Sequence, residues 1–251
     1  MKHFVTRISA EGVIFTSLSD DNALVEEHYD FTDRNEHRYK EQLNAFLGSS
    51  QLKDRDHDEH TISWFGSRTT LIPSSVFNES DATEIFRLCF GGDTHKSDID
   101  YNRLPDLGIV NVFELPLWLK SFFVMRYPRS VIQHEGSVIL RSFMHHTPFR
   151  LKILISVYRQ HFQLLIADQG KLIFYSTFDH GNTDDILYNL MFTLQQKELL
   201  DRSGNLILTS GVGSDINADE LTEKIQRIQN LGELKITVDQ TYTLKAHQLC
   251  V

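Results

Sequence analysis

The sequence of 251 residues predicts an α/β protein with two lobes, each built around a mixed β-sheet. Two observations lead to this prediction. Short runs rich in β-branched and aromatic residues, separated by turn-forming residues, indicate three strands at the start of each half. Amphipathic helical patterns then alternate with further strand-like runs in both halves. We therefore expect an N-terminal lobe over residues 1–145 and a C-terminal lobe over residues 146–251.

The first half starts with three predicted strands and a helix. The strands cover His3–Ser9, Val13–Leu18 and Leu24–Phe31. Asp33 and Glu36 have capping-box spacing, and the apolar residues after them recur at helical spacing until Gly48, where we expect the helix to end. The other predicted elements are a strand over Thr61–Ile72, a helix over Asp81–Phe90, a turn-rich segment over Gly91–Leu107, a strand over Gly108–Glu114 and a helix over Leu117–Tyr127, opened by Pro116.

The second half repeats this order. Its predicted elements are strands over Leu151–Tyr158, Phe162–Ala167 and Lys171–Phe178, a helix capped by Asn182, a buried strand over Asn205–Thr209, a helix opened by Asn217 and ended by Gly232, and a strand over Leu234–Val238. Three antiparallel strands, a helix, a strand and a helix form the ribonuclease-H-like unit, which is duplicated in actin, heat-shock chaperones and sugar kinases. The element order thus predicts an actin-like fold made of two ribonuclease-H-like lobes.

Composition and charge limit the classes of function. Hydrophobic residues make up 41% and charged residues 24% of the chain, as in globular proteins. The formal net charge of -9 disfavours nucleic acid as a partner. The two cysteines cannot build a disulfide framework or a cysteine-based zinc site. Because the amino terminus lacks the pattern of a signal peptide and no apolar stretch reaches the ~20 residues of a membrane span, we expect a soluble, cytoplasmic protein.

Four short stretches carry a resemblance to a known family: Thr70–Pro73 with Phe77, Val110–Phe113, Gly170–Phe178, and Asp185–Tyr188. They resemble an uncharacterised bacterial family that carries a domain of unknown function and is similar to divergent actin-like ATPases. The resemblance covers most of the chain and implies a two-lobed α/β protein with a cleft between the lobes. More distantly, it extends to actin-like cytoplasmic proteins of pilus and secretion machines, in which the fold serves as a docking platform.

Asp168-Gln169-Gly170 is the segment that most resembles a magnesium and phosphate loop of such ATPases. An actin-like site needs its glycine loop at the first turn of each half, where backbone N–H groups meet the phosphates and a carboxylate holds the water of the metal ion. The first turn of the second half is Arg159-Gln160-His161, so Asp168 belongs to the second turn. We therefore interpret Asp168 and Gly170 as a tight turn away from the cleft.

The first turns of both halves lack the expected carboxylate. The turn of the first half is Ser9-Ala10-Glu11-Gly12, in which Ala10 stands where an ATPase of this fold would present aspartate two residues before the glycine. Successive side chains of a strand take opposite faces, so Glu11 is expected to point elsewhere. In the second half, Arg159 and His161 could meet an anion, although an exposed arginine in a turn is common.

The segment Ser210-Gly211-Val212-Gly213-Ser214 is the best ligand candidate in the sequence. It follows a predicted strand and precedes a predicted helix, where glycines let the backbone approach a ligand closely. In actin-like ATPases a glycine-rich turn at this place packs on adenosine. The alternative is that Gly211 and Gly213 only make the turn.

Other candidate motifs are weaker. His57-Asp58-Glu59-His60 has two imidazoles and two carboxylates that could bind zinc, but it lies in a charged run typical of a solvated loop. His145-His146 precedes Thr147-Pro148 at the expected joint between the lobes, where nothing requires a ligand. The sequence has no nucleophile elbow, P-loop lysine motif or His-Glu-x-x-His helix. A nuclease needs several converging carboxylates, which the apolar central strands do not offer.

The sequence thus favours a non-catalytic actin-like interaction or assembly module with a degenerate nucleotide cleft, an unknown protein partner, no catalytic residue, no resident metal and no required cofactor. The alternative is a nucleotide-binding ATPase with unusual phosphate loops, which would bind ATP and magnesium. Its candidate cleft residues are Ser9, Gly12, Arg159, Gly211 and Gly213.

Overall fold

The computed structural model describes residues 3–18, 24–33, 35–50, 59–128, 130–145, 149–229 and 231–249. The chain forms two compact units, which we call unit 1 (up to Val138) and unit 2 (Ile139–Leu249). The division falls inside helix α4 (Glu135–His145). These units are defined by compactness. The lobe boundary expected after residue 145 stays a prediction.

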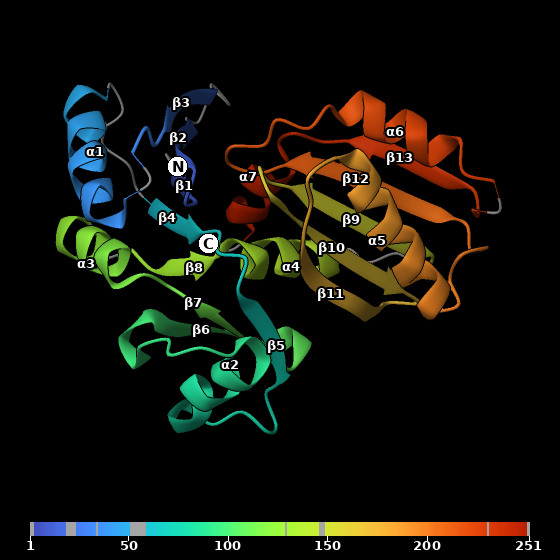
Figure 1. Ribbon diagram of the computed structural model, residues 1–251, viewed down its shortest axis with the longest axis horizontal. Coiled ribbons are helices and arrows are strands. Elements are labelled where there is room, and N and C mark those ends of the chain that lie inside the picture. Colours follow the sequence, from blue (N-terminus) through green and yellow to red (C-terminus); the bar gives the residue numbers. More distant parts are fainter. Residues whose placement is uncertain are drawn as a thin grey trace. The chain divides into compact units, whose positions relative to one another are not determined.

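Unit 1 contains a five-stranded sheet in the order β3-β2-β1-β4-β8 (Figure 1). Its elements are β1 (His3–Ile8), β2 (Gly12–Leu18), β3 (Leu24–Asp30), α1 (Glu36–Ser49), β4 (Glu59–Trp64), α3 (Leu117–Arg126) and β8 (Ile132–His134). β1, β2 and β3 are antiparallel neighbours, whereas β4 runs parallel to both β1 and β8. α1 and α3 cover one face, where Phe15, Leu43 and Phe123 are fully buried.

A second, three-stranded sheet of unit 1 interrupts this order between β4 and α3. It contains β5 (Thr69–Pro73), α2 (Ala82–Phe90), β6 (Ile99–Leu104) and β7 (Ile109–Glu114), with the strand order β5-β7-β6. Short 3-10 helices cover Glu79–Asp81, Lys96–Asp98 and Pro105–Leu107. The single strand expected over Thr61–Ile72 is wrong, because it is two strands in different sheets. The segment expected to be only turns, Gly91–Leu107, contains β6.

Unit 2 contains a five-stranded sheet in the order β11-β10-β9-β12-β13. Its elements are β9 (Leu151–Val157), β10 (His161–Asp168), β11 (Lys171–Asp179), α5 (Thr183–Gln196), β12 (Gly204–Ser210), α6 (Ala218–Gln226), β13 (Leu234–Val238) and α7 (Tyr242–Gln248). Residues of α5 and α6 such as Ile186, Leu190 and Leu221 form a core with alternate residues of β9, β10 and β12. Figure 1 shows both helices on the same face of this sheet.

The two five-stranded sheets have the same connectivity. In each, the first three strands in the sequence are antiparallel neighbours, and the fourth joins the first strand in parallel. The duplicated order predicted from the sequence is therefore confirmed, with the three-stranded sheet as an insertion in unit 1.

Besides β6, three elements did not appear in the sequence interpretation. β8 has three residues, too few for an alternating pattern. The first half of α4 is buried all round, from Glu135 to Leu140, so it lacks the polar face that identifies an amphipathic helix. α7 has seven residues.

Gly48 lies inside α1 instead of ending it. No helix in the described ranges is long and apolar enough to cross a membrane.

Candidate functional site

The candidate site in unit 2 is the edge of the sheet where two parallel strands end. Val157 of β9 pairs with Ser210 of β12, so these strand ends lie side by side. Ligands of open α/β sheets bind beyond the carboxyl ends of parallel strands. The candidates Arg159, Gly211 and Gly213 follow directly on these two ends, and the structure therefore brings them to one edge. Ser9 and Gly12 belong to unit 1 and are described separately.

Asp168 lies at the opposite end of the β9–β10 ladder. Phe162 pairs with Val157 near the candidate edge, whereas Ala167 pairs with Lys152 near the start of β9. The side chain of Asp168 is 11% exposed, and its Oδ2 accepts a hydrogen bond of 2.8 Å from Nη2 of Arg202. The turn after it is tight, because Gln169 and Gly170 both have positive φ, 49° and 76°. The carboxylate is therefore engaged in an ion pair far from the Arg159 turn.

The glycine-rich turn after β12 is packed against an aromatic ring. A Cβ atom built on Gly211 would lie 2.0 Å from Cε1 of Tyr158, so only glycine fits. Tyr158 is 1% exposed, and the N–H of Gly211 donates to the carbonyl of Val157 at 2.7 Å. Gly213 has φ +77°, which favours glycine in this turn. The close approach that the sequence suggested for a ligand is made by the side chain of Tyr158.

Two histidines stabilise the hairpin turn between β9 and β10. His161 Nδ1 lies 2.7 Å from Oδ1 of Asp179. The backbone N–H of His180 donates to the carbonyl of Gln160 at 2.9 Å, and its Nε2 lies 2.9 Å from the carbonyl oxygen of Tyr158. A carbonyl only accepts, so Nε2 of His180 carries the proton. Its Nδ1 is buried without a hydrogen-bond partner in the described part of the chain.

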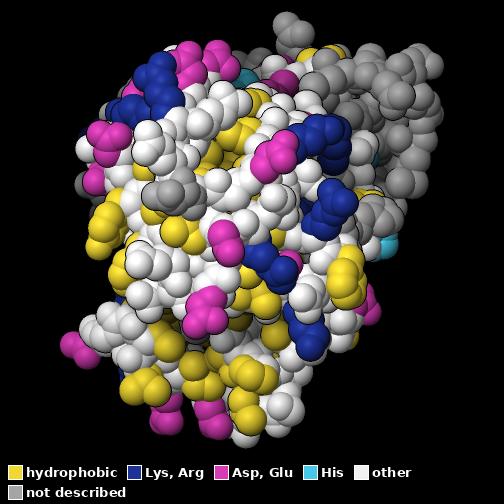
Figure 2. Space-filling view, turned by 90° about the vertical axis from the view of Figure 1, so that its right-hand side faces the viewer, with side chains coloured by type: hydrophobic (Ala, Val, Ile, Leu, Met, Phe, Trp, Pro, Cys, Tyr) yellow, Lys and Arg dark blue, Asp and Glu magenta, His cyan; other side chains and the backbone are white. Residues whose placement is uncertain are grey.

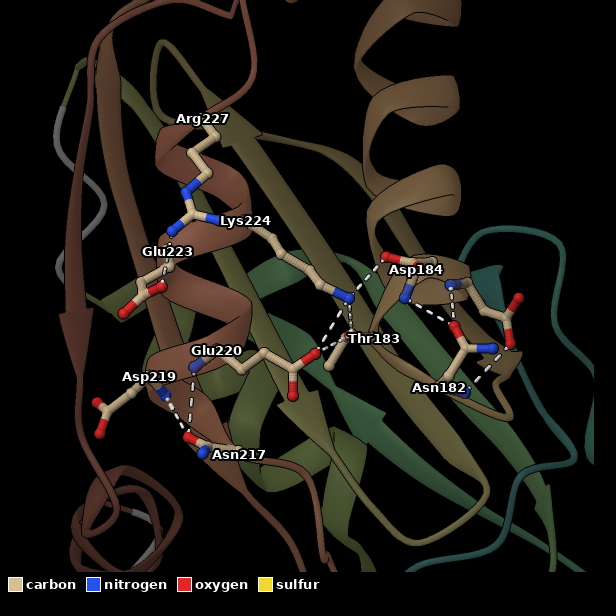
Figure 3. Close-up of polar contacts among 10 residues, drawn as sticks. Asn182, Thr183, Asp184, Asn217, Asp219, Glu220, Glu223, Lys224 and Arg227 are labelled. Carbon is tan, nitrogen blue, oxygen red and sulfur yellow. Dashed lines mark hydrogen bonds and ion pairs between the residues drawn. The ribbon is translucent and has the colours of Figure 1, made fainter.

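Helices α5 and α6 both begin near this edge, and asparagine caps each of them (Figure 3). Oδ1 of Asn182 accepts from the N–H groups of Asp184 and Asp185, and Oδ1 of Asn217 accepts from those of Asp219 and Glu220. The cap side chains occupy the helix N–H groups that would otherwise be available to an anion. The acidic residues in these first turns also repel a phosphate group.

Lys224 connects the starts of the two helices, as Figure 3 shows. Its Nζ lies 2.6 Å from Thr183 Oγ1, 2.8 Å from Asp184 Oδ1 and 3.0 Å from Glu220 Oε1. Thr183 Oγ1 in turn donates to Glu220 Oε1 at 2.9 Å. Hydrogen bonds to Asp184 and then Glu220 raise the pKa of Lys224, and the hydrogen bond from Lys224 lowers the pKa of Glu220. This cation is therefore committed to carboxylates of its own chain.

A small pocket lies between the strand ends and α6. Its volume is about 10 Å³, which is room for about one water molecule. It is lined in part by Val157, Thr209, Ala218 and Gln240. Thr209 is 2% exposed, and its Oγ1 has no hydrogen-bond partner in the described ranges. The pocket has a polar group to hold a water molecule but is too small for an adenine base.

The first turn of unit 1, Ser9–Gly12, is held by internal contacts. The N–H of Ser9 donates to the carbonyl of Gly12 at 3.0 Å, and Oγ of Ser9 accepts from the N–H of Glu11 at 3.0 Å. A Cβ on Gly12 would lie 2.4 Å from the carbonyl oxygen of Tyr29, so the neighbouring strand requires this glycine. Both Ser9 and Gly12 are buried. Each therefore has a structural role in the hairpin.

A buried polar cluster in unit 1 escaped the sequence analysis. Arg7 of β1 donates to both carboxylate oxygens of Glu135, at 3.4 and 3.3 Å, and Ser63 of β4 donates to Oε2 at 3.2 Å. Arg7 is 5% and Glu135 0% exposed. Arg7, a charged residue beside the apolar Val5 and Ile8 in a predicted strand, was the signal that could have indicated a buried partner. Glu135 could not be paired with it, because β8 and α4 were not recognised.

His134 adjoins this cluster and is neutral. Its Nε2 donates to the carbonyl of Gly66 at 2.9 Å, and its Nδ1 accepts from the N–H of Gly136 at 3.1 Å. Burial lowers the pKa of His134 from its ordinary value of 6.5 to about 4. Both ring nitrogens are used in the backbone around the start of α4, which indicates a positioning role in the fold.

The described residues contain no group of three or more His, Cys, Asp or Glu side chains that could hold a metal ion. Of the charged run His57–His60, His57 and Asp58 lie outside the described residues, as does His146. Both ring nitrogens of His60 are engaged, since Nε2 lies 2.8 Å from Thr6 Oγ1 and Nδ1 lies 3.1 Å from Ser130 Oγ. His60 is therefore not poised to bind zinc.

Comparison with protein families gave one match, to a model described as a protein of unknown function (DUF3822), over residues 2–231. No curated protein matches the sequence. Among solved structures, a protein of Bacteroides thetaiotaomicron with an actin-like ATPase fold and unknown function is similar, with 18% identity and a TM-score of 0.81, over 100% of this chain and 96% of that one.

Two further structures show the same fold. The PilM-PilN type IV pilus biogenesis complex matches with 11% identity and a TM-score of 0.56, over 95% of this chain and 91% of that chain. A ROK family glucokinase from Streptomyces griseus in complex with glucose and AMPPNP matches with 10% identity and a TM-score of 0.50, over 99% of both chains. At such low identities these similarities show the fold alone, and the predicted actin-like fold is confirmed.

Proposed function

Since the chain belongs to the DUF3822 family of proteins of unknown function and has the actin-like ATPase fold, we propose that it is a non-catalytic interaction or assembly module. In this proposal the nucleotide site of the fold is degenerate, and the chain needs no nucleotide or metal ion to act. The step from fold to role depends on the chemistry of the site, because one fold hosts many functions.

The observation that carries the proposal is the contact between Tyr158 and Gly211. The ring lies where a ligand would approach the glycine, since a Cβ on Gly211 would already be 2.0 Å from the ring. The neighbouring turn, Arg159-Gln160, offers no carboxylate for the water of a metal ion. Of the acids at the helix starts, Asp185 completes the cap of α5, and Asp184 and Glu220 pair with Lys224. A nucleotide would have to displace these internal contacts.

The proposed partner is a protein. The net charge of -9 disfavours nucleic acid, and Figure 2 shows positive and negative side chains interspersed on one face, together with exposed hydrophobic side chains. On α3, Leu117, Val124 and Met125 share one helix face and are 53%, 49% and 76% exposed. PilM, whose fold is similar, was solved as a complex with PilN in type IV pilus biogenesis. That precedent supports a docking role for this fold.

Titration calorimetry with ATP and magnesium, together with thermal unfolding, tests the absence of a nucleotide site. We expect no heat of binding and no thermal shift at millimolar nucleotide. A site that binds only the folded state would add about 2.7 kcal/mol of stability at a hundred times its dissociation constant. A clear shift that disappears in Arg159→Ala, while this exposed-site variant unfolds at the same temperature as the natural chain without nucleotide, would contradict the proposal.

Affinity capture from the native cell tests the docking role. We expect the tagged chain to recover the same protein partner with ATP and magnesium present and after enzymatic removal of nucleotides. Arg159→Ala serves as the matched variant and should recover that partner equally well. Repeated recovery of the tagged chain alone would count against an interaction module.

The second candidate function is an ATPase with unusual phosphate loops, for which the sequence suggests Ser9 and Gly12 in unit 1 and Arg159 and the Gly211–Gly213 turn in unit 2. The observation in its favour is Thr209, whose buried hydroxyl has no partner among the described residues and lines the pocket at the strand ends. ATP hydrolysis that Thr209→Val abolishes, with unfolding stability retained, would favour this candidate. The test is a phosphate-release assay on purified protein.

A further inference from the structure

Strand β11 forms one edge of the sheet of unit 2 and pairs with β10 (Figure 1). It is nine residues long, from Lys171 to Asp179. All residues from Leu172 to Phe178 are half-buried, whereas Phe162–Asp168 of the neighbouring β10 are buried throughout. The edge is therefore accessible, and its outer backbone groups form a row to which another strand can bind.

Apart from the extra residue Ile173 in its ladder with β10, β11 lacks the features that protect the other described edge strands. Proteins protect edges with charged side chains, proline or very short strands. β3 carries Glu26, Glu27 and Asp30, β6 carries Asp100 and Arg103, β5 ends in Pro73, β8 has three residues and β13 has five. Between Lys171 and Asp179, β11 contains only uncharged residues and no proline. Its sequence is thus suited to strand pairing.

The charges at the two ends of β11 make the strand complementary to a second copy of itself. Lys171 and Asp179 lie at equal distances in sequence from Tyr175. When two such strands pair antiparallel about Tyr175, Lys171 of each copy lies opposite Asp179 of the other. Leu172 then faces Phe178, and Phe174 faces Ser176. The ladder with β10 steps from Phe174 to Leu172, so Ile173 is an extra residue in β11, and the register is regular from Phe174 to Asp179.

We propose that β11 is a self-association surface, at which two copies of the chain join their sheets through antiparallel β11 strands. The interface is isologous, so the Lys171 and Asp179 pair occurs twice. Backbone hydrogen bonds supply the attachment, and the terminal charges select the antiparallel register. The proposal does not depend on nucleotide binding, so it stands or fails separately from the proposed function.

A charge-reversal experiment tests the register. Lys171→Asp and Asp179→Lys each place like charges opposite one another at both ends of the interface, and each should weaken self-association about tenfold, equivalent to about 1.4 kcal/mol. Mixing the two variants pairs a positive strand with a negative one, so the mixture should form heterodimers with at least the affinity of the natural homodimer. The measurement is sedimentation equilibrium over a concentration series.

Two controls keep the result specific to β11. Lys235→Asp changes the same charge on β13, the opposite edge of the sheet, and should leave association unchanged. Asp179→Lys also removes the contact between Asp179 and His161, so near-ultraviolet circular dichroism should show that its fold is intact. The double variant Lys171→Asp with Asp179→Lys restores both pairs and should associate like the natural chain.

Several outcomes would overturn the proposal. One is a chain that stays monomeric at high micromolar concentration. Another is a dimer that neither single reversal weakens. A mixture of the two variants that fails to form heterodimers would exclude antiparallel pairing about Tyr175. If the chain stays monomeric but binds an added extended peptide of another protein through β11, then β11 is a site for that peptide rather than for a second copy.

Discussion

The ring of Tyr158 lies against Gly211, so that a Cβ on residue 211 would be 2.0 Å from Cε1 and 2.2 Å from Cδ1 of the ring. Tyr158 follows β9 and Gly211 follows β12, two strands that are parallel neighbours. The contact therefore fixes two turns at the edge of the sheet where ligands bind in open α/β folds. A glycine that looks like part of a ligand site is explained by packing within the chain.

Gly211→Ala should destabilise the chain by about 1–3 kcal/mol, because the new methyl group forces the Tyr158 ring or the backbone to move. Urea denaturation measures this change in the free energy of unfolding. Gly181→Ala is the matched control in unit 2, since its Cβ would meet only Asp185 Oδ2 at 3.5 Å, and it should change stability by less than about 0.5 kcal/mol. Equal stability of the two variants would show that Tyr158 does not require this glycine.

Asp168 and Arg202 should couple weakly in a double-mutant cycle. Arg202 is 47% exposed, so solvent screens the ion pair and the coupling energy should be about 1 kcal/mol or less. The cycle consists of Asp168→Ala, Arg202→Ala and the double variant, measured by urea denaturation. No variant should alter any response to ATP and magnesium. Loss of a nucleotide response in Asp168→Ala alone would contradict the assignment of this carboxylate to a structural turn.

His134 should make stability depend on pH in acid. Its pKa is about 4 in the folded chain and near 6.5 when unfolded, so between these values the unfolded chain binds the extra proton. The free energy of unfolding therefore rises with pH across this window, and this contribution is complete above pH 6.5. Between pH 4 and pH 6.5, the titration of His134 should change the free energy of unfolding by about 3 kcal/mol.

The contribution of His134 is isolated by comparison with His134→Gln. Glutamine can still donate to Gly66 but does not titrate, so the stability of the variant should depend less on pH between about 4 and 6.5. Equilibrium denaturation at several pH values measures both proteins. Identical pH profiles would show that His134 is not buried in its neutral form.

Lys224→Met should loosen the attachment of α5 to α6 and reduce the salt dependence of stability. The substitution leaves Asp184 and Glu220 without the cation that they share. At an ionic strength of about 1 M the Debye length falls to about 3 Å, so the natural chain and the variant should differ less in high salt than in low salt. Arg227→Met is the control, because the ion pair of Arg227 with Glu223 lies at the end of α6 and does not reach α5. A larger effect of Arg227→Met would contradict a linking role for Lys224.

Much of the fold was predictable because its pattern is local. In β9, β10, β11 and α5, turn residues and apolar spacing within about a dozen residues specify each element, and the capping box of Asn182 and Asp185 marks where α5 begins. The same local evidence failed for Thr61–Ile72, where the chain leaves β4 after Trp64 and enters a second sheet with β5 at Thr69. It also failed for α4, whose buried residues show no amphipathic period.

The sequence therefore established the duplicated order of strands and helices, and with it the fold, because hydrophobic periodicity is a local property of the chain. It also showed that Arg159 and Asp168 belong to different turns. Only the tertiary structure decided what each candidate contacts: Tyr158 against Gly211, Arg202 on Asp168, and Glu135 beside Arg7. These contacts join residues far apart in the sequence, and which side chain fills a given space depends on strand pairing that no single segment encodes.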